Sequence, residues 1–135
     1  MQLIKGETVP IRAPNDIVIV RQKVRAWAIE IGFSIIEQTK IITAASELAR
    51  NTLDYGGGGE CELASVKNSL NKSGLQLSFV DQGPGIANLE LALTDGYTSG
   101  GGLGMGLTGS RRLMNDFKIE TEIGKGTRVT VIKWK

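Results

Sequence analysis

The chain has 135 residues, of which 41% are hydrophobic and 22% are charged, and its formal net charge is +2. These values suit a single soluble domain over residues 1–135, and so small and dispersed a charge gives no indication of nucleic-acid binding. The one cysteine, Cys61, cannot form an internal disulfide, and no apolar run is long enough to cross a bilayer. Without a signal-peptide pattern at the start, we expect a cytoplasmic protein that binds neither membrane nor nucleic acid.

The first part of the chain predicts an edge strand followed by two helices. Residues 8–12 form a short extended segment, which a proline restricts to the edge of a sheet. Helical spacing of apolar residues after a proline start signal predicts a first helix over 14–32, ended by a glycine. Ser34 and Glu37 then match a capping box, which predicts the start of a second helix that reaches about Tyr55.

The later part of the chain predicts mostly strands. Alternating apolar residues favour strands over 61–67 and 75–81, joined by a hairpin turn at 71–74. The remaining predicted elements are a short helix at 88–95, a longer helix at 105–116 and a closing hairpin whose strands are at 117–123 and 127–134. Because strict alternation of strands and helices is absent, a Rossmann or flavodoxin-like sheet is disfavoured. We predict an α+β fold, a two-layer α/β sandwich whose mixed, mainly antiparallel sheet is covered by about three helices on one face.

Two compositional features narrow the chemistry. Histidine is absent, which excludes Ser-His triads, histidine zinc ligands and a phosphohistidine mechanism. Eleven of the 18 glycines lie in two runs, at 56–59 and 96–109. Such clustering indicates loops with a specific purpose, because glycine allows close backbone approach to a ligand.

The second helix carries two stripes of side chains. One is predicted to pack and consists of Ile41, Ala45, Leu48, Ala49 and Thr52. The other is polar and consists of Thr43, Glu47, Asn51 and Asp54. Glu47 and Asn51 lie one turn apart, so their oxygens could hold a hydrated Mg2+, or Glu47 could orient or deprotonate a hydroxyl. Seen alone, the polar stripe is better explained as a solvated face on which Glu47 pairs with Arg50 or another neighbour.

A proline-glycine turn, Asp81-Gln82-Gly83-Pro84-Gly85, follows the strand over 75–81. Such turns are common and need no function. The functional interpretation is that Asp81 accepts a hydrogen bond from an exocyclic amine such as that of adenine. Gly83 and Gly85 would then let the backbone approach a flat ring.

A second glycine run, at 100–106, leads into the helix predicted at 105–116. Successive backbone N–H groups at a helix start can cradle phosphates, although the same run could be a mobile loop. Residues 104–109 also match G-x-G-x-x-G, but no strand precedes them, so we reject a dinucleotide-binding fold. No P-loop sequence occurs, and the small size and missing histidine exclude the protein-kinase fold.

In order and spacing, four segments resemble the N, G1, G2 and terminal Gly-Thr boxes of the GHKL (Bergerat-fold) ATPases. They are residues 47–51, 81–86, 100–106 and 126–127, and the likeness runs from about Ser34 to the C-terminus. A chain of this length has no room for the second domains of gyrase, Hsp90 or MutL. Without histidine it cannot be a self-contained histidine kinase.

Within that superfamily the chain resembles the bacterial anti-sigma-factor serine/threonine kinases. The stretches 46–51 and 81–86, Tyr55 and the end 132–134 are most similar to the RsbT-like switch kinases. The resemblance implies an ATP-dependent kinase of a partner-switching, stress-signalling pathway that phosphorylates a serine or threonine on a STAS-domain protein. Two alternatives are an anti-sigma factor that sequesters a sigma factor, and an activator that docks on a phosphatase. The sequence identifies neither the partner nor the oligomeric state.

The same resemblance implies roles for individual residues, with ATP and Mg2+ as cofactors. Asn51 would ligate Mg2+, and Glu47 would be the general base or orient the attacking group. Asp81 would bind the adenine amine, with Thr127 completing that contact. The other nucleotide-binding residues, which shape the base pocket or form a lid over the phosphates, would be Gly83, Gly85, Ile86, Gly100, Gly101, Gly102, Leu103, Gly104, Met105 and Gly106.

One departure from the family pattern concerns positive charge. Related kinases often place a basic residue in the lid to meet the γ-phosphate, whereas residues 96–109 contain no lysine or arginine. Arg50, Arg111 and Arg112 are the nearest basic residues along the chain. The sequence leaves open which of them, if any, neutralises charge in the transition state.

Overall fold

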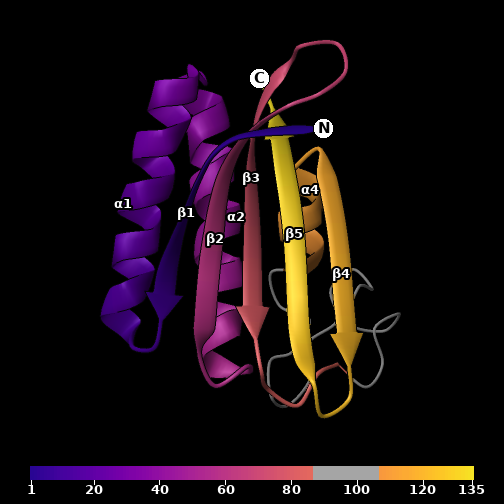
Figure 1. Ribbon diagram of the computed structural model, residues 1–135. Helices are drawn as coiled ribbons and strands as arrows, with labels where there is room; N and C mark the ends of the chain where they lie inside the picture. The colour runs from indigo at the N-terminus through magenta and orange to yellow at the C-terminus, as the bar shows by residue number, and fades with distance from the viewer. Residues whose placement is uncertain (87–106) are drawn as a thin grey trace.

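A computed structural model of the chain describes residues 1–86 and 107–135 (Figure 1). In chain order, the described elements are β1 (Gln2–Ile11), α1 (Pro14–Ile31), α2 (Ile35–Asp54), β2 (Gly59–Lys67), β3 (Ser73–Asp81), α4 (Leu107–Leu113), β4 (Asp116–Glu122) and β5 (Gly126–Trp134). The helix predicted at 88–95 and the glycine run at 100–106 lie outside the described residues. None of the helices in the described part is both long and apolar enough to cross a membrane.

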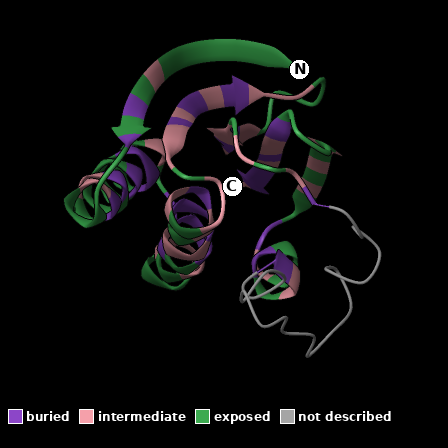
Figure 2. Ribbon diagram, turned by 90° about the horizontal axis from the view of Figure 1, so that it is seen from below, coloured by how far each residue is buried: buried purple, intermediate pink, exposed green. Residues whose placement is uncertain are grey.

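The five strands form one sheet in the order β1-β2-β3-β5-β4. All four strand pairings in the described residues are antiparallel, so the sheet shows no parallel part of the kind that a mixed sheet would have. The helices α1, α2 and α4 lie together on one face of the sheet (Figures 1 and 2). The predicted two-layer α+β sandwich is therefore confirmed. The last strand, β5, lies between β3 and β4, and this insertion places Thr127 opposite Asp81.

Local sequence signals set the helix ends as predicted. At the start of α1, the Asp16 carboxylate accepts hydrogen bonds from backbone N–H groups that the helix leaves unpaired, among them that of Ala13 at 3.1 Å. Gly32 ends this helix in the left-handed region, with φ of 102°, where a side chain would be strained. Ser34 caps α2, because its hydroxyl oxygen accepts a hydrogen bond from the backbone N–H of Glu37 at 3.2 Å.

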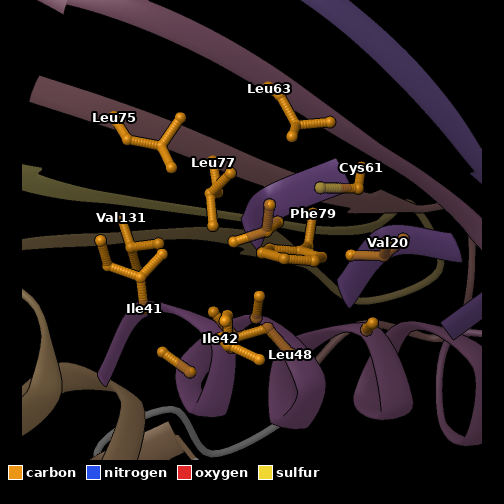
Figure 3. Packing of buried hydrophobic residues seen from close by; sticks show 14 of the residues in the cluster. Val20, Ile41, Ile42, Leu48, Cys61, Leu63, Leu75, Leu77, Phe79 and Val131 are labelled. Atoms are coloured by element: carbon orange, nitrogen blue, oxygen red, sulfur yellow. The ribbon is translucent and has the colours of Figure 1, made fainter. Parts of the chain in front are cut away.

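The hydrophobic core lies between the sheet and the helices. Figure 3 shows strand side chains directed toward α2, among them Leu63, Leu75, Leu77, Phe79 and Val131. The five members of the predicted packing stripe of α2 are all buried. Truncating a buried side chain such as Ile41 or Leu48 to alanine typically costs about 2–5 kcal/mol, so the face that carries the stripe is fixed firmly against the sheet. The polar stripe of the same helix is thereby turned away from the core.

The first strand is longer than the sequence predicts, at Gln2–Ile11 instead of 8–12. Residues 2–6 are exposed, so they lack the alternation of buried and exposed side chains from which a strand is recognised. Pairing with β2 extends along the strand all the same, with a register irregularity between Leu3 and Lys5. β1 forms one edge of the sheet, as its proline predicts.

The turn between β2 and β3 lies earlier than predicted. The Asn68 side-chain oxygen accepts hydrogen bonds from the backbone N–H groups of Leu70 and Lys72, both at 2.9 Å, which closes the turn there. Asn71 adopts a φ of 63°, and β3 has already begun at Ser73. The predicted position at 71–74 is therefore wrong by about two or three residues, because the glycine that suggested it belongs to the strand.

Candidate functional site

A pocket opens between α2, the C-terminal end of β3, the start of β5 and the first described residue of α4. It encloses about 470 Å³, including its open mouth. The described residues that line it are Leu48, Asn51, Thr52, Tyr55, Gly56, Phe79, Asp81, Gly85, Ile86, Leu107, Thr127 and Val129. Five of the predicted nucleotide-binding residues are thus brought together here, from segments far apart in the chain: Asn51, Asp81, Gly85, Ile86 and Thr127. Most of the other lining side chains are apolar, which suits a flat ring with a few polar edges.

Asp81 is the one carboxylate in the described wall of this pocket. One of its oxygens accepts a hydrogen bond from the backbone N–H of Gly83 at 2.9 Å, which fixes the side chain in the turn. Burial raises the pKa of Asp81 above its ordinary value, while hydrogen bonds from the backbone of Gly83 and Thr127 act in the opposite direction. The carboxylate is therefore held in place and partly desolvated, so a donor on a ligand would form a strong, charge-assisted hydrogen bond with it.

Thr127 is oriented by a second threonine that the sequence analysis did not single out. The hydroxyls of Thr127 and Thr121 lie 2.9 Å apart, and the Thr121 oxygen also accepts the backbone N–H of Ile86 at 2.9 Å. The Thr121 hydroxyl is 3.2 Å from the carbonyl oxygen of Gly126, to which it can donate. When Thr121 donates there, Thr127 must donate to Thr121, and the lone pairs of Thr127 are left for a donor in the pocket.

Close backbone contacts explain why glycines surround Asp81. A Cβ atom on Gly83 would lie only 2.7 Å from the Cα atom of Gly56, and a Cβ on Gly56 would overlap the Asp81 carboxyl group. Gly85 has a φ of 78°, and a Cβ there would overlap the carbonyl oxygen of Glu122. Gly83 and Gly85 were predicted to let the backbone approach the flat ring of a bound base. The structure shows that both also allow the turn to pack against neighbouring backbone, and that Gly83 lies outside the pocket lining.

The polar stripe of α2 contributes one residue to the described lining of the pocket. Asn51 lines the pocket, and Glu47 lies one helical turn before it, half-buried and not among the lining residues. No ion pair joins Glu47 to Arg50 within residues 1–86 and 107–135. A carboxylate and an amide oxygen at this spacing are the hard ligands that Mg2+ prefers, and a bound phosphate and water would supply the rest.

Two further observations limit what the site contains. Among the described residues, no group of three acidic, cysteine or histidine side chains could hold a metal without help from a ligand. The described lining also contains no lysine or arginine. Arg50, Arg111 and Arg112 are all exposed on their helices, outside this lining.

The fold and this pocket define an ATPase domain. Residues 36–135 match the family described as histidine kinase-, DNA gyrase B- and HSP90-like ATPase, and the chain belongs to that family. Among named proteins, the chain is 44% identical over 119 residues to the serine/threonine-protein kinase RsbT of Bacillus subtilis (strain 168), across 88% of this chain and 89% of that protein. It is 31% identical over 117 residues to the anti-sigma F factor of Clostridium beijerinckii, across 84% of this chain and 82% of that protein.

Solved structures support the fold alone, because their sequence identities are low. The RsbU and RsbW domains of a Mycobacterium tuberculosis protein match with a TM-score of 0.63 and 18% identity, covering 96% of this chain and 32% of that one. A chain of the SiaB–SiaC complex of Pseudomonas aeruginosa matches with a TM-score of 0.54 and 15% identity, covering 98% of this chain and 91% of that one. The family resemblance drawn from the four sequence boxes is confirmed, and the matched segment begins within two residues of the position expected.

Proposed function

We propose that this chain is an ATP-dependent protein serine/threonine kinase of a bacterial partner-switching pathway, and that its substrate is a STAS-domain protein. The observation that carries the proposal is the similarity to RsbT at 44% identity over most of both chains. The pocket adds physical support, because its charged acceptor, its apolar walls and its amide side chain come together in one place. A cytoplasmic location, where ATP is plentiful, accords with this activity.

The base of ATP would bind at Asp81. The carboxylate would accept a hydrogen bond from the exocyclic amine of adenine, and Thr127 would accept another, directly or through a water. Phe79, Ile86 and Val129 supply apolar contacts for the ring. Guanine carries an oxygen where adenine carries this amine, so it would face the Asp81 carboxylate with an acceptor and be rejected.

The phosphates would extend from the base toward α2. Asn51, which lines the pocket, would ligate Mg2+, and the metal ion would neutralise charge on the phosphate oxygens. In the transfer step, the substrate hydroxyl oxygen forms a bond to the γ-phosphorus, the bond to ADP breaks, and Glu47 takes the hydroxyl proton. The glycines of 100–106 are proposed to close over the phosphates, a role that concerns residues outside the described part of the chain.

A direct assay tests this function. The protein is incubated with radiolabelled ATP, Mg2+ and the STAS-domain proteins encoded beside it, and labelled protein is followed on gels. Asn51→Ala is expected to abolish transfer while the folded fraction, measured by circular dichroism, stays close to wild type. Thr43→Ala is a matched control, because Thr43 lies on the same helix, exposed and away from the pocket lining. Full Mg2+-dependent transfer by Asn51→Ala would contradict the metal assignment.

A second candidate function is supported by the anti-sigma F factors, which are 31% identical to this chain in the Clostridium beijerinckii case. In that case the chain would bind a sigma factor and use ATP to switch partners. Co-purification from cells distinguishes the two. Recovery of a sigma factor would favour the anti-sigma function, and recovery of STAS-domain proteins alone would favour the switch kinase.

An activator that docks on a phosphatase is expected to keep activating that phosphatase when Asp81→Asn removes adenine binding.

A further inference from the structure

The helix α4 forms part of the pocket wall although it is intrinsically weak. Leu107, its first described residue, is buried and lines the pocket. The described part of the helix, Leu107–Leu113, carries a glycine, Gly109, near its middle. Glycine lowers the intrinsic stability of a helix. The position of Leu107 in the pocket wall therefore depends on contacts that hold α4 from outside.

One such contact is made by a buried lysine at the far end of α4. The Lys133 side chain is only 9% exposed, and its Nζ atom donates a hydrogen bond to the carbonyl oxygen of Leu113 at 3.0 Å. Leu113 is the last residue of α4, where unpaired carbonyls make a cation favourable. The same Nζ atom lies 3.0 Å from a carboxylate oxygen of Glu37. Two acceptors thus compensate the cost of burying the ammonium group.

The neighbours of Lys133 hold the residues that follow α4. The carbonyl of Ile132 accepts the backbone N–H of Asn115 at 3.0 Å, and the Asn115 side chain accepts the backbone N–H of Trp134 at 2.7 Å. The Trp134 indole donates to the Asp116 carboxylate, also at 2.7 Å. The end of β5 therefore fastens the α4–β4 connection on both sides of the lysine.

Glu37 gives this contact a second anchor. It lies in the first turn of α2, the helix whose other end carries Asn51, and Lys133 holds the pKa of the Glu37 carboxyl below its usual range. Lys133 consequently joins three elements: the start of α2, the end of β5 and the end of α4. Within residues 1–86 and 107–135, neither Leu113 nor Glu37 lines the pocket, so Lys133 would influence a ligand through the position of the helices that it holds.

We propose that Lys133 is a positioning residue for the nucleotide pocket: by holding the C-terminal end of α4, it keeps Leu107 in the wall against which the nucleotide binds. This inference rests on the proposed function, in which the pocket binds ATP. A purely structural role for Lys133 would predict loss of stability without any selective effect on ATP. The two roles therefore differ in measurable ways.

The test compares Lys133→Met with two controls. Lys23→Met removes a similar lysine–glutamate pair between α1 and β1, and Val24→Ala weakens the core at α1, both away from α4. Calorimetric titration measures the Kd for ATP with Mg2+, and hydrogen exchange with mass spectrometry measures protection of the amides at 109–113. For Lys133→Met we expect faster exchange at 109–113 and a Kd raised by roughly three- to tenfold, as when the binding-competent population falls to about 10–30%. The controls are expected to keep both values near wild type.

Other variants protect the test against misfolding. Glu37→Gln keeps the contact of Lys133 with Leu113, so its Kd is expected to stay within about twofold of wild type. By reciprocal linkage, ATP bound to the unchanged protein must slow exchange at 109–113. No such slowing, or a normal Kd in Lys133→Met despite faster exchange, would overturn the inference. Failure of the unchanged protein to bind ATP would instead overturn the proposed function, while the exchange rates still decide whether Lys133 holds α4.

Discussion

Replacing Asp81 by asparagine changes the hydrogen bonding of the pocket with little change in shape. The asparagine oxygen can still accept the backbone N–H of Gly83, so the turn that holds the side chain is retained. The atom left for the ligand is then an amide N–H2, which donates where adenine also donates. Loss of a hydrogen bond to a charged acceptor costs about 1.5–3 kcal/mol, and the opposed donors add to this. We expect a loss of about 3 kcal/mol, roughly two orders of magnitude in the Kd for ATP.

Calorimetric titration of both proteins with ATP and with GTP measures this effect. The preference for ATP over GTP is expected to shrink or reverse in Asp81→Asn, because an amide donor suits the guanine oxygen. Circular dichroism checks that the variant is folded. An Asp81→Asn protein whose ATP affinity stays within about threefold of wild type would refute the assignment of Asp81 to the base.

The raised pKa of Asp81 adds a dependence on pH. ATP affinity of the unchanged protein is expected to fall as the pH drops through this raised pKa, because the protonated carboxyl loses its charge. The free energy of unfolding depends on pH for the same reason. The Asp81 carboxyl stabilises the folded state below its ordinary pKa, and this stabilisation is lost as the pH rises through the raised pKa of the folded protein. Asp81→Asn should remove the pH dependence of ATP affinity and that of stability. If the variant retained either pH dependence, another group would be responsible for it.

Three further predictions concern residues around the site and in the core. Gly85→Ala is expected to lower the free energy of unfolding in urea by about 1–3 kcal/mol, because its φ of 78° disfavours a side chain and the added Cβ would overlap Glu122. Gly57→Ala, with a φ of 74° and open space around it, is the control that measures the backbone cost alone. Ser110→Ala should leave stability unchanged or raise it by up to about 1 kcal/mol, because the buried Ser110 hydroxyl has no hydrogen-bond partner among the described residues; a marked loss of stability in urea unfolding would contradict this. Burial raises the pKa of the Cys61 thiol, so native protein should react with a thiol reagent only as fast as it unfolds, and rapid labelling would contradict that burial.

The second helix shows what sequence alone can predict well. Its cap at Ser34 and its packing stripe depend on short-range spacing, and both are found where expected. Once the stripe faces the sheet, the polar residues of the helix must face elsewhere, which directs Asn51 into the pocket. The strand β1 was underpredicted for the opposite reason, since its first residues are exposed on both sides and leave no periodic signal.

The site was only partly predictable because it depends on long-range pairing. Thr121 lies in an edge strand and carries no motif, and its contact with Thr127 requires the register of β4 against β5. Gly56 follows α2 in a glycine run that indicated a loop, whereas its close contact with Gly83 depends on how two turns meet. The inward alternation of 117, 119 and 121 was a signal that could have indicated Thr121. No local pattern could have indicated the contact at Gly56.

The insertion of β5 between β3 and β4 makes the pocket depend on distant parts of the chain. The strands β2 and β3 pair through a short turn, whereas β1 meets β2, and β5 meets β3, only across long intervening stretches of chain. Asp81 and Asn51 precede β4 and β5 in the chain, yet the pocket also needs Thr127 and Val129 of β5. A nucleotide that contacts all of these residues would bind only after β5 has docked on β3, and by mass action it would stabilise that pairing. Under the proposed function, ATP would distinguish a completed fold from an unfinished one before the protein engages any partner.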